Sequence, residues 1–340
     1  MPCQWYVTRS KLSQCRALYS QPGPHAIKMR SLKHMMRIND QSIQRYAWST
    51  IAVLALTDWI WMSCIGFKLS ADSARQSALI LAAVIMISVV LRLVSRYPYT
   101  DPDRQSFYQH VADVFSWIAV MAVFTHVGVL FQYLCVSSDF PSINSTLIAV
   151  DGTIGFHWPT VYAWVLKHQY VDLALSIAYK SGFAQLLAIP FVLAVTRHSR
   201  DYAEFVVQFI VASIVAILIS LPLPAESAFT YFSVSDPQAR ATVSDFLALR
   251  NGSLRELAFP LAQGLVSFPS LHTILALCFA YSLRHVRSLF PLGIFINLCM
   301  IISTPTHGGH YLCDVLSGLI VGALIILWVR RLFSQSKKKP

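Results

Sequence analysis

Eight apolar stretches, each long enough to cross a lipid bilayer, constrain this chain more than any other feature of its sequence. A membrane-spanning helix needs about 20 mostly apolar residues, and this chain of 340 residues is 55% hydrophobic and only 13% charged. Soluble domains carry about 25% charged residues, so we predict an all-α, polytopic membrane helical bundle with about eight transmembrane helices. The expected helices cover residues 49–68, 77–96, 110–136, 180–197, 205–224, 267–286, 289–305 and 310–330.

The distribution of Lys and Arg predicts how these helices are oriented. Eight spans place both ends of the chain on one side, and cytoplasmic segments of membrane proteins are enriched in positive charge. With both ends in the cytoplasm, most of the 27 Lys and Arg fall on that side. The net charge of +11 therefore reflects membrane orientation rather than nucleic-acid binding. The basic residues left outside are Lys68, Arg75, Lys167, Lys180, Arg240, Arg250 and Arg255.

Charge and hydropathy divide the chain into four parts. Residues 1–48 are basic, lack the apolar core of a secretory signal, and are expected to form a cytoplasmic tail, either ordered or disordered. Residues 49–204 hold the N-terminal transmembrane helices, 205–332 hold a C-terminal membrane core, and 333–340 form a second basic cytoplasmic tail. The stretch 160–178 is amphipathic and either lengthens the fourth helix or lies along the membrane surface.

Three ionisable side chains, Asp58, Asp113 and His126, fall inside predicted spans. Ionisable groups at membrane depth usually face the bundle interior and mark a functional site. The alternative is a structural pairing with a polar group on a neighbouring helix.

Two short polar motifs open apolar helices on the same, non-cytoplasmic side of the predicted bundle. The first is SFPSLHT, residues 267–273, and the second is HGGHYLCD, residues 307–314. The long outside segment 225–266 precedes the first motif and can fold over it, as long ordered loops often do at functional sites. The sequence therefore predicts that both motifs meet at one surface.

His310 and Asp314 are four residues apart, a spacing that places two side chains on the same face of a helix. A carboxylate in this position accepts the proton of one imidazole nitrogen and leaves the other nitrogen with its lone pair exposed. His310 is therefore the candidate nucleophile, with Asp314 as the group that orients it. His272 comes from the other motif and is the candidate proton donor to a leaving oxygen.

The residues around these histidines are suited to an oxyanion or a phosphoryl group. Ser270 and the N–H groups after it open a helix, where unpaired donors and the helix dipole attract anions. Gly309 allows the backbone to approach an anion closely, and His307 is expected to line the same pocket. A zinc site built from the three histidines and the aspartate is the alternative, but we predict no metal and no other cofactor.

The strings FPSLH (268–272) and GGHYLCDVLSG (308–318) resemble the second and third signature motifs of the type 2 phosphatidic acid phosphatase superfamily. The closest resemblance is to the branch that contains inositol phosphorylceramide synthase, an inositolphosphotransferase, and its bacterial relatives. It covers roughly residues 205–330 and implies a six-helix, phosphatase-type core whose site lies at a membrane face.

The resemblance also implies a role for each matching residue in a phosphoryl transfer that needs no metal. His310 would form a phosphohistidine, Asp314 would orient it, and His272 would protonate the leaving group. Ser270 would help to bind the phosphate oxygens.

The chain departs from the family pattern at two phosphate-binding cations. The first family motif, Lys-x6-Arg-Pro, has no counterpart, and Thr304 stands where the third motif usually carries Arg. Each charge-assisted contact is worth about 1.5–3 kcal/mol, so the substrate is less charged or other cations substitute. Arg250 is the predicted substitute, with Arg255 beside it in the sequence and Arg240 and Lys180 further away.

Together these observations predict an integral membrane lipid phosphatase or phosphotransferase that acts on a phosphorylated lipid at the non-cytoplasmic face. The membrane is a bacterial inner membrane or a eukaryotic endomembrane, and the expected partners are the lipid phosphate and the bilayer. A head-group transferase, such as one that moves inositol phosphate in sphingolipid synthesis, is the alternative within the family. A membrane transporter or a non-catalytic scaffold is the alternative of another class.

Overall fold

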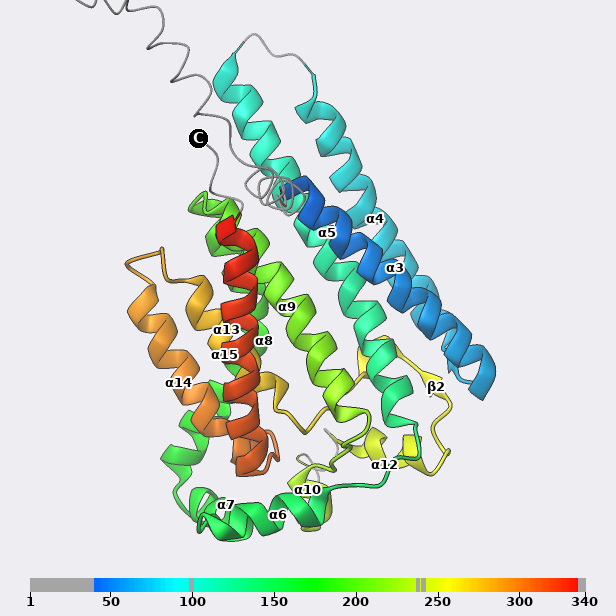
Figure 1. The fold of residues 1–340 in the computed structure, drawn as a ribbon, viewed down its shortest axis with the longest axis vertical. Coiled ribbons are helices and arrows are strands. Elements are labelled where there is room, and N and C mark those ends of the chain that lie inside the picture. Colours follow the sequence, from blue (N-terminus) through cyan, green and yellow to red (C-terminus); the bar gives the residue numbers. More distant parts are fainter. Residues whose placement is uncertain (1–39, 98–100, 237–238, 240–242, 336–340) are drawn as a thin grey trace, which may run out of the picture. The chain divides into compact units, whose positions relative to one another are not determined.

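The computed structural model describes residues 40–97, 101–236, 239 and 243–335, and most of them are helical (Figure 1). Residues 40–331 form one compact unit. In chain order the elements are α3 (Asp40–Ile65), β1 (Lys68–Leu69), α4 (Ala71–Ser95), α5 (Pro102–Val136), α6 (Asn144–Thr153), α7 (Trp158–Lys167), α8 (Gln169–Val195), α9 (Ser199–Ser220), α10 (Ala228–Tyr231), α12 (Ser244–Arg250), β2 (Glu256–Leu257), η1 (Phe259–Leu261), α13 (Leu271–Ser282), α14 (Phe290–His307) and α15 (Leu312–Gln335).

Seven of these helices confirm the predicted all-α, polytopic membrane bundle. Each of α3, α4, α5, α8, α9, α14 and α15 is long and apolar enough to cross a membrane. The fourth predicted span is longer than residues 180–197, as the amphipathic stretch suggested, because α8 begins at Gln169 and the short helix α7 precedes it. Helix α3 begins at Asp40, inside the predicted tail, and the rest of that tail lies outside the described residues.

The sixth predicted span, 267–286, is shorter in the structure than expected. Helix α13 has 12 residues, which at 1.5 Å per residue is about 18 Å, whereas the hydrocarbon core of a bilayer is about 30 Å thick. Residues 267–270, which belong to the predicted span, form a buried loop before the helix, in which Ser267 is 7% and Ser270 0% exposed. Hydropathy does not separate this loop from a helix, because both are buried, so the described residues contain seven candidate spans rather than eight.

Helix α15 packs closely on α13 because Gly318 and Gly322 face it. A Cβ atom on Gly318 would lie 2.8 Å from the carbonyl oxygen of Ser270, and one on Gly322 would lie 2.9 Å from Cδ1 of Leu277. Small residues four apart allow membrane helices to approach in this way. The contact brings the starts of the two helices together, so that the N–H of Ser270 donates to the carbonyl of Asp314 at 3.0 Å.

Helix α5 connects the N-terminal helices to the rest of the unit, because it contacts α3 and α4 as well as α9. Arg92 of α4 pairs with Asp113 of α5 at 3.1 Å, which supports the structural alternative for this aspartate. Asp58 of α3 is 2% exposed, and its carboxylate has no hydrogen-bond partner among the described residues.

The short helices α6, α7, α10 and α12 gather at one end of the bundle (Figure 1). The segment 225–266 runs through this region and reaches the second motif, since Ser227 Oγ donates to the carbonyl of Gly309 at 3.0 Å. It also holds β2, which pairs in parallel with β1 and so ties the α3–α4 connection to the segment before α13.

A buried ion cluster joins α9 to the residues that follow α13. The Arg284 guanidinium lies 2.8 Å from Asp201 Oδ1 and 2.6 Å from Glu204 Oε2. The two acidic residues are 6% and 3% exposed, and Arg284 is the cation they share, although His285 also contacts Asp201 and Tyr281 donates to Glu204.

Replacing Arg284 is therefore expected to destabilise the protein strongly. Arg284→Ala leaves two carboxylates buried without their cation, and breaking a buried pair in this way costs about 3–5 kcal/mol. Thermal unfolding in detergent should show a clearly lower Tm than for the wild type. Arg287→Ala, which removes an exposed arginine three residues away, is the matched control, and equal Tm values for the two variants would contradict the role given to the cluster.

Candidate active site

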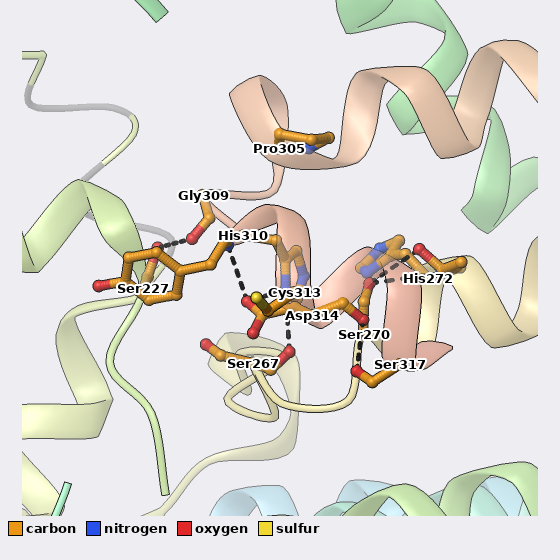
Figure 2. Close-up of polar contacts among 12 residues, drawn as sticks. Ser227, Ser267, Ser270, His272, Pro305, Gly309, His310, Cys313, Asp314 and Ser317 are labelled. Atoms are coloured by element: carbon orange, nitrogen blue, oxygen red, sulfur yellow. Dashed lines mark hydrogen bonds and ion pairs between the residues drawn. The ribbon is translucent and has the colours of Figure 1, made fainter. Parts of the chain in front are cut away.

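The two sequence motifs meet where three helix ends converge: the start of α13, the end of α14 and the start of α15 (Figure 2). The ring centroids of His272 and His310 lie 6.3 Å apart. The rings are therefore too far apart for a direct hydrogen bond but close enough for a phosphoryl group to lie between them. This arrangement places His272, His310 and Asp314 together, as the sequence suggested.

His310 is held through its Nδ1 atom by two acceptors. Nδ1 lies 3.0 Å from the carbonyl oxygen of Ser267 and 3.3 Å from Oδ2 of Asp314. A carbonyl oxygen can only accept, so the proton of the neutral imidazole must be on Nδ1. Nε2 then carries the lone pair, which is the state that a nucleophile or base requires. The Ser267 carbonyl was not anticipated, because it lies in the loop that was predicted as helix.

Asp314 reaches His310 without the helical geometry that its spacing suggested. Helix α15 begins only at Leu312, so His310 lies in the turn before the helix and Asp314 in its first turn. Oδ2 of Asp314 also accepts the N–H of Tyr311 at 2.8 Å, and the residue is 0% exposed. The carboxylate is thus fixed by the backbone as well as by the imidazole.

His272 lies in the first turn of α13 and is stacked on a residue that sequence reasoning missed. Tyr179 of α8 places its ring 4.4 Å from that of His272, and its hydroxyl lies 3.3 Å from Nδ1 of His272. The hydroxyl therefore fixes the orientation of this imidazole. In the sequence, Tyr179 is an ordinary aromatic residue at the edge of the amphipathic stretch, so no local signal could identify it.

Ser270 acts as the cap of α13 in this structure. Its Oγ accepts the N–H of Thr273 at 3.4 Å, and its own N–H donates to Asp314. The side chain is 0% exposed. Its predicted contact with phosphate oxygens stays a prediction, and the serine orders the helix start on which His272 stands.

Gly309 adopts a left-handed backbone conformation, with φ of +63°. A Cβ atom there would clash with Ser227 and Phe229, so only glycine fits. Its carbonyl accepts the N–H of Ala228 at 2.7 Å as well as the Ser227 hydroxyl. Gly309 therefore anchors the turn that presents His310, and its expected contact with an anion is untested.

A second aspartate, Asp151 of α6, caps the helix that carries Asp314. Its Oδ2 accepts the N–H of Leu312 at 2.8 Å and its Oδ1 accepts the N–H of Cys313 at 2.9 Å. Free N–H groups at a helix start are the usual anion-binding donors, and here the protein's own carboxylate occupies two of them. Because Asp151 is distant in sequence from both motifs, no local pattern indicates this role.

His307 points to α8 rather than to the other two histidines. Its Nε2 lies 3.2 Å from Oδ1 of Asp172, and Lys180 is close enough for its charge to interact with the ring. No group of three or more His, Cys, Asp or Glu among the described residues is arranged to hold a metal ion. The role of His307 as a pocket-lining or phosphate-binding residue stays a prediction.

Arg250, the predicted substitute cation, is engaged elsewhere. Its guanidinium donates to the carbonyl oxygens of Ser138 and Phe140 at 2.9 and 2.6 Å. Burial raises the pKa of Glu226, and the positive charge of Arg250 partly offsets that rise. No contact within the described part of the chain joins Arg250 to His272, His310 or Asp314, and Arg240 lies outside that part. Phosphate binding by Arg250 therefore stays a prediction, and no contact between Arg250 and the three site residues supports it.

Fold and site together define a polytopic membrane bundle with a paired His and Asp facing a second His. The model of the PAP2 superfamily matches residues 145–328, more than half of the chain, and the chain belongs to this superfamily. Since its members are phosphoesterases, the chain is a membrane protein of the phosphatase type. The match also takes in nearly all of α6 and the whole of α7 and α8, which lie outside the resemblance that begins near residue 205. No curated protein and no solved structure matches the chain.

Removal of the Asp151 carboxylate is expected to loosen the start of α15. Asp151→Ala leaves two buried N–H groups without an acceptor, and the loss of a helix cap costs about 0.5–2 kcal/mol. Denaturation in detergent should show the loss, with Asp139→Ala, a substitution of an exposed aspartate, as the control. An unchanged stability for Asp151→Ala would show that the cap contributes nothing.

Proposed function

We propose that this protein transfers the phosphoryl group of a lipid phosphate through a covalent intermediate on His310. The observation that carries the proposal is the pair of acceptors on Nδ1 of His310, the Ser267 carbonyl and Asp314. They hold the proton on Nδ1 and leave Nε2 free to attack phosphorus. The phosphatase type of the superfamily supports phosphorus as the atom attacked.

In the first half of the reaction, Nε2 of His310 forms a bond to phosphorus while the bond from phosphorus to the lipid oxygen breaks. His272 donates a proton to that oxygen, so the lipid leaves as an alcohol. A negatively charged phosphate between the rings favours the protonated form of His272, and Tyr179 keeps the ring facing it. Asp314 stabilises the positive charge that develops on His310.

In the second half, an acceptor oxygen attacks the phosphohistidine. His272, now neutral, takes the proton of the acceptor, and the bond between Nε2 and phosphorus breaks. Water as the acceptor gives free phosphate and a phosphatase, whereas an alcohol gives a new phosphoester and a transferase. The first half of the reaction is the same in both cases.

Transfer of a phospho-head group is the second candidate, and the charge around the site favours it. Among the described residues, no Lys or Arg forms a hydrogen bond or ion pair with His272, His310 or Asp314. Thr304, at the position of the family's arginine, is 0% exposed and bonds the carbonyl of Met300 within α14. A phosphodiester carries one negative charge and therefore needs fewer compensating cations than a dianionic phosphomonoester, and such a substrate is the one expected of the inositolphosphotransferase-like branch.

The proposed site lies at the non-cytoplasmic face, with both chain ends in the cytoplasm of a bacterial cell or facing the cytoplasm from a eukaryotic endomembrane. The distribution of Lys and Arg supports this orientation. With both chain ends in the cytoplasm, the chain must cross the membrane an even number of times. Helix α13 and the buried loop before it must therefore form one crossing together.

His310→Ala is expected to abolish turnover, because it removes the atom that bonds to phosphorus. The purified protein would be assayed in detergent with EDTA on phosphatidic acid, a prenyl diphosphate, and phosphatidylinositol with ceramide. We expect a loss of at least about 10³-fold in kcat for the variant, with His198→Ala, a substitution of the residue before α9, as the control. Turnover that survives in His310→Ala, or that requires a metal, would overturn the proposed mechanism.

Asp314→Asn is expected to reduce kcat by about 10²-fold, a smaller loss than His310→Ala causes. Removing a triad aspartate can cost about 10⁴-fold when the wrong tautomer results, but here the Ser267 carbonyl still holds the Nδ1 proton. Asp314→Asn removes only the negative charge that stabilises the positively charged imidazole of His310 during the reaction. Equal losses in the two variants, in steady-state kinetics on the same substrate, would show that Ser267 does not fix the tautomer.

A further inference from the structure

A cavity of about 420 Å³ lies between α5, α8, α9 and α13, with His272 in its wall. This volume is within the range of about 300–1,000 Å³ that is typical of ligand pockets. Most of the residues that line it are apolar, and these four membrane-spanning or apolar helices contribute most of them, with the segment 259–264 and Met300 of α14 contributing the rest. The cavity therefore begins at a catalytic histidine and extends into the apolar interior of the bundle.

The spacing of the lining residues shows that the cavity is elongated along the helices. Helix α5 contributes Phe124, Gly128 and Gln132, which are four residues apart and so lie one above another on the same face. Eight residues of helix correspond to about 12 Å. The same spacing recurs on α9 at Phe209, Ser213 and Ile217, and on α13 at Leu271, Leu275 and Phe279.

The two ends of the cavity differ in polarity. At the end beside His272, Gln132 donates to the carbonyl of Gln263 at 2.9 Å. At the opposite end the rings of Phe124 and Phe209 meet edge to face, with centroids 5.6 Å apart. A polar end at the catalytic histidine and an apolar end far from it match an amphiphile whose phosphate is at the site.

Two polar residues of α5 between these ends bond to the backbone of their own helix. His126 Nδ1 bonds the carbonyl of Ala122 at 2.9 Å, and Thr125 Oγ1 bonds that of Met121 at 2.8 Å. They therefore leave an apolar path along α5. Phe183 of α8 lines the cavity and is 81% exposed, so the cavity opens sideways between α5 and α8, where a lipid can enter from the bilayer.

We propose that this cavity binds a hydrocarbon chain of the lipid phosphate, and that α5 is the wall that selects chain length and shape. The inference rests on the proposed function, because it assumes that the phosphate lies between His272 and His310. Helix α5 ends before residue 145, where the family match begins. The N-terminal helices thus add to the superfamily core the surface that distinguishes one lipid chain from another.

Gly128 is the position at which this selection can be tested. A Cβ atom there would lie 3.5 Å from the ring of Phe124, an ordinary contact, so Gly128→Ala fits without displacing its neighbours. A leucine would occupy the middle of the stripe between Phe124 and Gln132 and shorten the cavity. Each methylene that is excluded from an apolar site reduces affinity by roughly fourfold.

The test compares dipalmitoyl and dihexanoyl phosphatidic acid as substrates. For Gly128→Leu, we expect the ratio of kcat/KM for the long to the short chain to fall at least about tenfold, mainly through KM. Phe124→Leu, which enlarges the apolar end, should shift the preference toward longer chains. Leu187→Phe adds bulk at a lipid-exposed position of α8 outside the cavity and is the control.

A readout that does not depend on turnover uses a phosphatidic acid with a photoreactive diazirine in its chain. Cross-linking to His310→Ala protein should label α5 at 124–132 and α13 at 271–279, and Gly128→Leu should reduce this labelling. An unchanged chain preference in both cavity variants, or labelling confined to lipid-facing surfaces, would overturn the inference. If the wild type turns over neither phosphatidic acid, nor a prenyl diphosphate, nor phosphatidylinositol with ceramide, the proposed function fails, and the cross-linking result still decides the cavity.

Discussion

The hydrogen bond from Nδ1 of His310 to the carbonyl of Ser267 is the contact on which the rest of the site depends. It joins the loop before α13 to the turn before α15, and it determines which nitrogen of the imidazole is free. Other contacts hold its two ends in place. Gly309 is anchored by Ser227, the start of α15 is capped by Asp151, and Gly318 allows α15 to approach α13 closely.

The same geometry relates the chemistry to the membrane. The short helix α13 carries His272 at its start, and its length places that residue beside an apolar cavity rather than in open water. A lipid phosphate can therefore present its phosphate to the two histidines while its chain remains in an apolar environment. Helix α5 lines this cavity although it lies outside the family match, and the proposed binding of a lipid chain there would give the N-terminal helices a role beyond packing.

Much of this arrangement could be predicted from the sequence, and the remainder depends on contacts that no local pattern records. Apolar length predicts the membrane bundle, and the spacing of His310 and Asp314 predicts their contact. The start of α13 could not be predicted, because residues 267–270 are mostly buried, as a helix would be, but form a turn. Tyr179 and Asp151 approach the site from distant positions. The prediction of Arg250 as a phosphate-binding cation rests only on its charge and on its side of the membrane. In the structure its guanidinium donates to backbone carbonyls instead.

The covalent intermediate on His310 is the central claim, and trapping it is the most direct test. Wild-type protein would be incubated with lipid phosphate that carries a radioactive phosphorus, quenched in alkali, digested, and examined by mass spectrometry. The mechanism predicts an acid-labile, alkali-stable phosphoryl group on the peptide that contains His310, and none in His310→Ala. A label on another residue, or turnover with no labelled protein in a rapid quench, would contradict it.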